Sequence, residues 1–241
     1  MTINKPFPLM YRPGPPNTLA PFYEETETPE AINNLSSYNL LKNDLRQIFE
    51  FIEPDPINET AFSHRTFELL LRACTEVESL CKQIFERNGH SLNHANIIRY
   101  SDLEGAMKLS EYKVKSYGFI YPIFSPFESF NDPIKVNRSP QWYKDYNSVK
   151  HNRFTNFSKC SLKNVIYSVG GVYVLLVAMY GIGFDHNLKY SYNLARMVDT
   201  PSFFRVLDYP QWPISEQYNY NWDNLKTEPI PFQNHPIPVI Q

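Results

Sequence analysis

The sequence predicts an all-α fold: an antiparallel helical bundle with an irregular insertion and proline-rich N- and C-terminal extensions. Two long segments repeat apolar residues at spacings of three and four, and a later run of 20 residues has no charged side chain. Seven prolines lie in residues 1–29 and seven more from residue 200 onward. We therefore divide the chain into an arm (1–29), a bundle domain (30–199, with the insertion at 89–138) and a tail (200–241).

Composition limits the classes of partner and compartment. The chain has 241 residues and a formal net charge of −2, so nothing attracts it generally to nucleic acid or to a membrane. Any anionic partner must meet a local basic patch, and we expect no DNA partner. Cys74, Cys81 and Cys160 have neither CxxC spacing nor a disulfide framework. The first residues, MTINKPFPLMYRPGPP, lack the unbroken apolar core of a secretory signal, and we expect a cytoplasmic protein.

The arm and the first helix are separated by a clear start signal. Residues 1–29 show little periodicity, and we expect an extended arm that lies on another surface. Thr28 supplies a cap, Pro29 a first-turn proline and Glu30 an early acid. The following apolar residues predict a helix at about residues 30–52: Tyr38, Leu41, Leu45, Ile48 and Ile52.

A second helix follows, with an even clearer pattern. Its stripe is Phe67, Leu70, Cys74, Val77, Cys81 and Ile84, and Asn88-Gly89 supplies the stop. Two of the cysteines lie on the stripe, which favours small core residues over catalytic thiols. Glu76 lies among apolar neighbours in the next row. A buried carboxylate needs a partner, so Glu76 either belongs to a site or turns to water and pairs with Arg72.

The insertion at residues 89–138 has weaker signals. His90 and His94 have the spacing of metal ligands, but the surrounding residues indicate a loop and no third ligand accompanies them, so we predict no metal site. Ser101 and Glu104 have the spacing of a capping box, which predicts a short helix. The aromatic and proline residues at 112–130 predict irregular structure with a short extended pair.

The next helix carries the candidate site. Ser139 and Pro140 form a start signal, and a helix from there places Asn147 and His151 on one face with Lys144 and Ser148 beside them. Tyr146, Lys150 and Arg153 are expected to form a neighbouring basic stripe. This combination indicates either an anion-binding site with an imidazole or an ordinary solvated helix face.

Residues 165–184 are uncharged and long enough to cross a bilayer, yet four glycines, three tyrosines and a serine favour a buried bundle helix, so no membrane partner is expected. Ser158 or Asn156 is expected to cap this helix and Gly181 to end it. A short helix is predicted at 187–198. The apolar, proline-rich tail is expected to wrap the bundle or a second subunit.

Two quoted segments, FSHRTFELLLRACTEVESLCKQIF and WYKDYNSVKHNRFTNFSKCSLKNV, resemble the helices of HEPN-like proteins, in particular bacterial and phage-associated members with an acid-bearing second helix and a YNxVKHxR string in the third. The resemblance covers about residues 30–185. It implies an all-α bundle that forms a homodimer and acts as a metal-independent endoribonuclease of a toxin or phage-defence type, without a cofactor.

The resemblance also implies roles for individual residues. The family signature is an arginine, four to six residues and a histidine, frequently with a polar residue after the arginine. His151 corresponds to the histidine and Asn147 to the polar residue. The arginine has no match, and Lys144 is the only cation at the permitted spacing.

In this hypothesis His151 transfers protons, Asn147 orients the phosphate, and Glu76 holds the histidine tautomer. Lys144, Lys150, Arg153 and Ser148 contact RNA. Two alternatives stay open. One is a non-catalytic interaction or dimerisation module that holds a protein partner through its proline-rich ends. The other is a nucleotide-binding protein, although no glycine-rich phosphate loop supports it.

Overall fold

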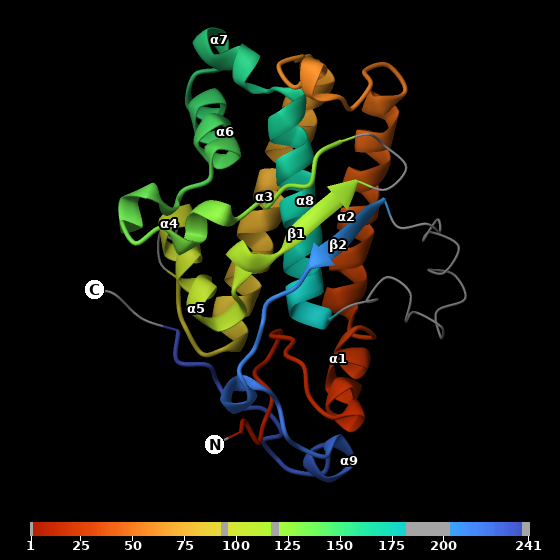
Figure 1. The fold of residues 1–241 in the computed structure, drawn as a ribbon, viewed down its shortest axis with the longest axis vertical. Helices are drawn as coiled ribbons and strands as arrows, with labels where there is room; N and C mark the ends of the chain where they lie inside the picture. Colours follow the sequence, from red (N-terminus) through yellow and green to blue (C-terminus); the bar gives the residue numbers. More distant parts are fainter. Residues whose placement is uncertain (1, 93–95, 117–120, 182–202, 238–241) are drawn as a thin grey trace.

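The computed structural model describes residues 2–92, 96–116, 121–181 and 203–237, and all structural statements below concern these residues. The chain is mostly helical, with one small sheet (Figure 1). Three long helices form the centre: α2 (Pro29–Phe49), α3 (His64–Arg87) and α8 (Leu162–Tyr180). The shorter α6 (Gln141–His151) packs against α3 and α8. The predicted helical fold class is therefore confirmed at this level.

Helix α2 begins at its predicted cap and α3 ends at its predicted stop. The Thr28 side chain accepts a hydrogen bond from the Ala31 N–H and caps α2. Ser63 and Thr66 form a reciprocal capping box at the start of α3. At the end of α3, Gly89 has φ +79°, a conformation that costs glycine little. The three cysteines are buried and free.

The apolar helix α8 is the core of the bundle. Its 18-residue apolar window is 89% buried inside the protein, and α8 is the one helix within the described ranges that is long and apolar enough to cross a membrane. Burial by α2, α3 and α6 is what a core helix requires. Ser161 caps it by accepting from the Asn164 N–H, so the predicted cap at Ser158 or Asn156 was placed too early. Gly181 ends the helix, as predicted.

Consecutive helices of the bundle alternate in direction, and α3 and α8, which pack against each other, run in parallel. The residues that precede α3 and α8 are joined by the Phe62–Ser161 bridge and by the hydrogen bond from Leu162 N–H to Ala61 O at 2.8 Å. Helices α3 and α8 therefore start at the same end of the bundle and run in the same direction. In Figure 1, α2 and α6 run the opposite way.

The insertion contains short helices and one strand. Its helices are α4 (Ile97–Tyr100) and α5 (Glu104–Met107). The predicted Ser101–Glu104 capping box does not form, because the Ser101 hydroxyl donates to Ile98 O and Glu104 accepts from Ser110. Single turns of 3-10 helix lie at Pro16–Leu19, Pro56–Asn58, Ser101–Leu103, Leu109–Glu111, Glu128–Asn131, Lys135–Arg138, Phe157–Lys159 and Ile214–Glu216.

The sheet joins the insertion to the tail. Strand β1 (Lys113–Ser116) pairs antiparallel with β2 (Phe204–Asp208), with Val114 opposite Val206. Val114 also bridges Phe124, which accounts for the predicted extended pair within residues 112–130. The main partner strand comes from the tail instead. The helix predicted at 187–198 lies outside the described residues.

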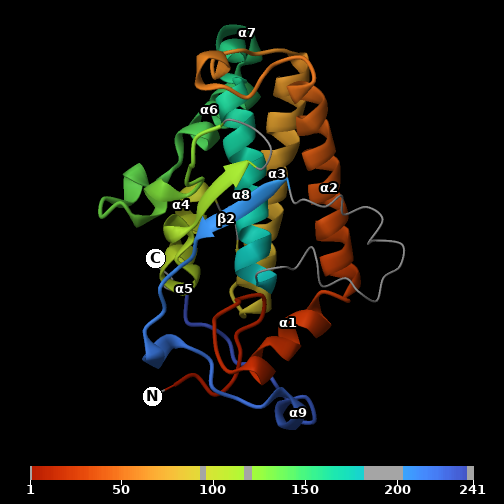
Figure 2. The same cartoon turned by 45° about the vertical axis from the view of Figure 1, so that its right-hand side comes forward.

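Both ends of the chain fold onto the lower end of the bundle (Figure 2). The arm contains the helix α1 (Ala20–Glu25), which the prediction of an extended arm missed, and the tail contains α9 (Trp222–Leu225). Buried Arg12 donates to Ala106 O in the insertion and to Glu216 O in the tail. Asn88 donates to Pro8 O and accepts from the His235 N–H. The described part of the tail thus packs on its own chain.

Candidate functional site

Helix α6 is fixed by an aromatic inner face. Trp142, Tyr143, Tyr146 and Val149 are buried, and the Trp142 indole donates to Pro126 O at 2.8 Å. These residues recur at spacings that put them on one side of a helix, which orients the opposite side to water. Pro140 occupies the N-cap position without a side-chain cap, so the helix begins one residue later than the Ser139 signal suggested.

The opposite side of α6 carries the predicted residues. Lys144 and His151 are exposed, and Asn147 and Ser148 are partly exposed between them. The Ser148 hydroxyl donates to Lys144 O at 2.9 Å, one turn back. We call these four residues the α6 stripe. The structure brings them together on one face, with the imidazole open to solvent.

The two remaining predicted cations are held by aromatic rings. Lys150 Nζ donates to the Tyr146 hydroxyl at 3.1 Å and lies 5.2 Å from the ring centroid, and this hydrogen bond raises the pKa of Lys150. The Arg153 guanidinium lies 5.3 Å from the ring centroid of Phe67 on α3. Tyr146 is buried and Arg153 starts a new helix, α7 (Arg153–Asn156), so the predicted continuous basic stripe is divided in two.

The structure does not bring Glu76 to His151, which corrects the predicted orienting role. Glu76 lines a cavity between α2 and α3 together with Ser37 and Leu41 of α2. Burial raises the pKa of Glu76. Successive residues on a helix are about 100° apart, so Glu76 and Glu78 point in nearly opposite directions, and only Glu78 faces α6.

Glu78 and Tyr143 form a contact between α3 and α6 that the sequence argument missed. The Tyr143 hydroxyl donates to Glu78 Oε1 at 2.7 Å, and burial together with this hydrogen bond raises the pKa of Tyr143. The sequence contained a signal for this contact. Glu78 lies one helical turn after Cys74, and Cys74 is on the predicted apolar stripe, so Glu78 is expected at the edge of the face that packs on other helices. This contact docks α6 onto α3 and leaves the α6 stripe free of carboxylate contacts in the described structure.

Of the two histidines with metal-ligand spacing, only His90 is among the described residues. His90 is paired with the tail through Nε2, 2.9 Å from His235 O, and His94 lies outside the described residues. No group of three or more histidine, cysteine or acidic side chains within the described ranges could hold a metal ion.

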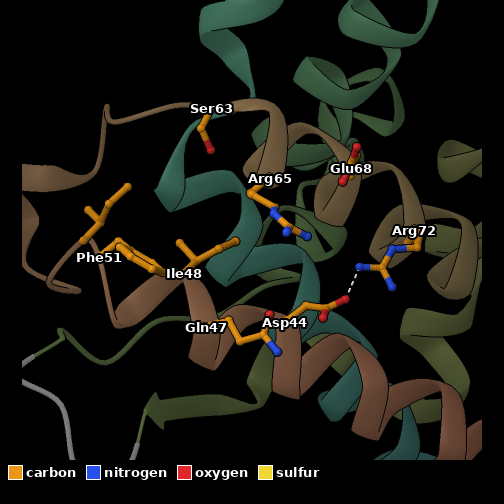
Figure 3. Close-up of a pocket in the computed structure, with 9 residues that line it drawn as sticks. Asp44, Gln47, Ile48, Phe51, Ser63, Arg65, Glu68 and Arg72 are labelled. Atoms are coloured by element: carbon orange, nitrogen blue, oxygen red, sulfur yellow. Dashed lines mark hydrogen bonds and ion pairs between the residues drawn. The ribbon is translucent and has the colours of Figure 1, made fainter.

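A separate pocket of about 260 Å³ lies between the end of α2 and the start of α3 (Figure 3). Ile48 and Phe51 form an apolar wall, and the Arg65 guanidinium lies between this wall and the ion pair of Arg72 with Asp44. Glu68 offsets the charge of Arg65, so the pocket is close to neutral overall. Because its two acidic and two basic side chains balance, this pocket lacks the positive charge that an anion site requires.

Comparison with known proteins adds no relative. No family model matches the chain, and neither a curated protein nor a solved structure matches it. The functional conclusion therefore depends on the chemistry of the described residues and on the sequence resemblance stated above.

Proposed function

We propose that this chain is a HEPN-like protein of the cytoplasm that binds RNA through the α6 stripe and cleaves it without a metal ion, as a homodimer, in a toxin or phage-defence role. The observation that carries the proposal is the exposed His151 ring in one row with an amide, a hydroxyl and an ammonium group. A phosphodiester offers acceptors for each of these donors.

The chemistry follows from the ordinary behaviour of these groups. The imidazole of His151 can take a proton from a ribose 2′-hydroxyl or give one to the leaving oxygen. Lys144 and Arg153 supply positive charge for the oxygens of the reacting phosphate, and Asn147 can donate a hydrogen bond to them. Ser148 can do the same once its hydroxyl turns away from Lys144 O, to which it donates at 2.9 Å in this structure. The displacement by the 2′-oxygen breaks the bond to the 5′-oxygen and leaves a 2′,3′-cyclic phosphate.

A dimer is part of the proposal because one imidazole cannot serve as base and acid in the same step. Neither α6 nor α7 carries a second histidine, so the proposal takes the second imidazole from another copy of the chain. Phe154 follows the stripe and is 96% exposed, which offers an apolar contact for such a partner. The expected active form therefore places two α6 stripes face to face across a two-fold axis.

The test is cleavage of mixed RNA by the purified protein in the presence of a chelator. We expect products with cyclic-phosphate ends, and we expect His151→Ala to lower the rate at least 100-fold while the helical circular dichroism stays unchanged. Lys226→Ala is the control, because it removes an exposed side chain of α9, which lies at the opposite end of the molecule from α7 (Figure 1). Equal rates for wild type and His151→Ala would refute the catalytic role.

A second candidate is a non-catalytic helical interaction module. The engagement of Lys150 and Arg153 by aromatic rings favours it, because side chains committed to packing are less available to a phosphate. The missing arginine of the family signature favours it too, since lysine lacks the planar fork that grips a phosphate at two points. This candidate predicts that neither the wild type nor His151→Ala cleaves the RNA in the same experiment. It is compatible with a stable dimer and with RNA binding.

A further inference from the structure

The outer face of α2 and α3 has two pockets that follow each other along the helices. The pocket of Figure 3, which contains Phe51 and Arg65, lies toward the α7 end of the bundle, and we call it the upper pocket. The cavity that contains Glu76 also contains Leu40 and has a volume of about 340 Å³, and we call it the lower pocket. Arg72 lines both pockets. They therefore form one continuous surface, which we call the α2/α3 groove.

Four charged residues of α3 follow this groove, in the order Arg65, Glu68, Arg72 and Glu76. Their spacings of three and four residues place them on one face of the helix. Their signs alternate, so the same row read backwards has the opposite charge at each position. Two antiparallel copies of α3 therefore place Arg65 of each copy opposite Glu76 of the other, and Glu68 of each copy opposite Arg72 of the other.

The outer members of this row, Arg65 and Glu76, are the charged pair of the groove. Arg72 is already joined to Asp44, whereas neither Arg65 nor Glu76 has an ion pair or a hydrogen bond to another side chain in the described part of the chain. Burial raises the pKa of Glu76, and no cation of the same chain opposes this effect. A partly buried carboxylate of this kind is stabilised by a cation from outside the chain.

The exposed apolar residues of the groove have the same spacing as the charged pair. Phe51 is 88% exposed in the upper pocket and Leu40 is 62% exposed in the lower pocket, and we call them the apolar pair. Eleven residues separate the members of each pair, which corresponds to about three helical turns or about 16 Å. In an antiparallel copy, the Phe51 ring therefore reaches the level of the lower pocket.

One two-fold axis serves both pairs. The midpoint of the apolar pair falls between Leu45 and Arg46, and the midpoint of the charged pair falls between Leu70 and Leu71. Both midpoints lie within about one helical turn of the ion pair that joins α2 to α3, so they are at the same level of the bundle. A half-turn about an axis that crosses the two helices at this level brings both pairs into contact together. This self-complementarity is what an isologous interface requires.

We propose that a second copy of this chain occupies the α2/α3 groove, antiparallel to the first, with Arg65 of each copy paired with Glu76 of the other and each Phe51 ring in the lower pocket of the other. Glu76 points away from α6, so this contact leaves the α6 stripe accessible. The inference does not rest on the proposed ribonuclease function. A chain that also pairs its α6 stripes would form an assembly larger than a dimer.

The test is sedimentation velocity of the full-length protein at physiological salt over a range of concentrations. We expect self-association that weakens at least tenfold in Arg65→Glu and in Glu76→Arg, because each variant places like charges opposite each other at two positions of the dimer. The double variant exchanges the two charges and should restore the dissociation constant to within about threefold of the wild type. Such a rescue identifies a contact between copies, since the two side chains are about 16 Å apart along one α3.

The apolar contact has its own variant and controls. Phe51→Ala should weaken self-association at least tenfold, because it removes the aromatic side chain that fills the lower pocket. Ile230→Ala, in the tail, is the apolar control, and Lys226→Glu, at the end of α9, is the charge-reversal control. Both controls should change the dissociation constant less than twofold. None of the substituted side chains is buried, so the helical circular dichroism should stay unchanged.

Three results would overturn the proposal. A wild type that stays monomeric at its highest soluble concentration would exclude the dimer. Equal self-association of the wild type, Arg65→Glu and Glu76→Arg would place the contact on another face, and Phe154→Ala would then show whether that face is the one beside the α6 stripe. Failure of the double variant to recover would show that Arg65 and Glu76 do not meet across the interface.

Discussion

Replacing Glu25 by glutamine should stabilise the protein at neutral and alkaline pH. The substitution keeps the shape of the side chain and removes a buried charge whose ion-pair partner, Arg87, has its Nη2 atom 3.8 Å away, beyond hydrogen-bond distance. In the folded protein, burial raises the pKa of Glu25 from its ordinary value of 4.5 to about 7. A difference of that size corresponds to about 3 kcal/mol at about 1.4 kcal/mol per pH unit.

The sign of the pH dependence follows from proton binding. Between pH 4.5 and about 7 the folded state holds more protons at Glu25 than the unfolded state does. Stability of the wild type therefore falls as pH rises through this window and is level above it. The glutamine variant lacks this term, so its advantage should be near zero at pH 4.5 and about 3 kcal/mol at pH 8.

Urea unfolding followed by far-ultraviolet circular dichroism at pH 5 and pH 8 measures the difference directly, because the remaining titrating groups are common to both proteins. Glu50→Gln, at the exposed end of α2, should change stability by less than about 0.5 kcal/mol at either pH. An equal effect of Glu25→Gln at both pH values would refute the reasoning, since it would mean that the carboxyl group titrates normally in the folded state.

Two further predictions concern packing, and the same urea measurement tests both. Gly170→Ala should lower the free energy of unfolding by about 1–3 kcal/mol, because a Cβ there would lie 2.7 Å from the buried ring of Phe124. Its control is Gly105→Ala, which should be neutral or stabilising because a Cβ there would meet no atom within 4 Å. Tyr143→Phe should cost about 1 kcal/mol through loss of the hydrogen bond to α3, whereas Tyr100→Phe should cost nothing, since the buried Tyr100 hydroxyl has no hydrogen-bond partner in the described residues.

The helices were predictable because their signals are local. The cap at Thr28 and the glycines at 89 and 181 each act within a few residues, and the structure has a helix end at or next to each of them. The apolar stripe of α3 is likewise a repeat of three and four residues within one helix. The capping box at Ser101 shows the limit of such signals. The Ser101 hydroxyl donates to Ile98 O, one turn back, and the Glu104 carboxylate accepts from the Ser110 N–H. The spacing of a capping box is therefore present without its hydrogen bonds.

The remaining features depend on contacts that are distant in sequence. Strand β1 pairs with a strand about 90 residues later, and no local pattern selects that partner. Glu76 and Glu78 both border the apolar stripe of α3, and only the placement of α2 and α6 decides which acid meets which helix. Glu25 is buried because the arm folds back on the bundle, whereas its own segment predicts an exposed acid. The exposed α6 stripe was predictable because it is the unpacked face of one helix.

Glu25 and the α6 stripe are far enough apart to act independently. Arg153, beside the α6 stripe, lies over Phe67, and Glu25 faces Arg87, so α3 separates them by 20 residues or about 30 Å. Ionic screening acts over about 8 Å at physiological salt, so a charge change at Glu25 does not alter the electrostatic field at His151. Figure 1 shows α7 and α1 at opposite ends of the bundle, which agrees with this separation. Loss of RNA cleavage in Glu25→Gln would therefore report a change in folding or assembly.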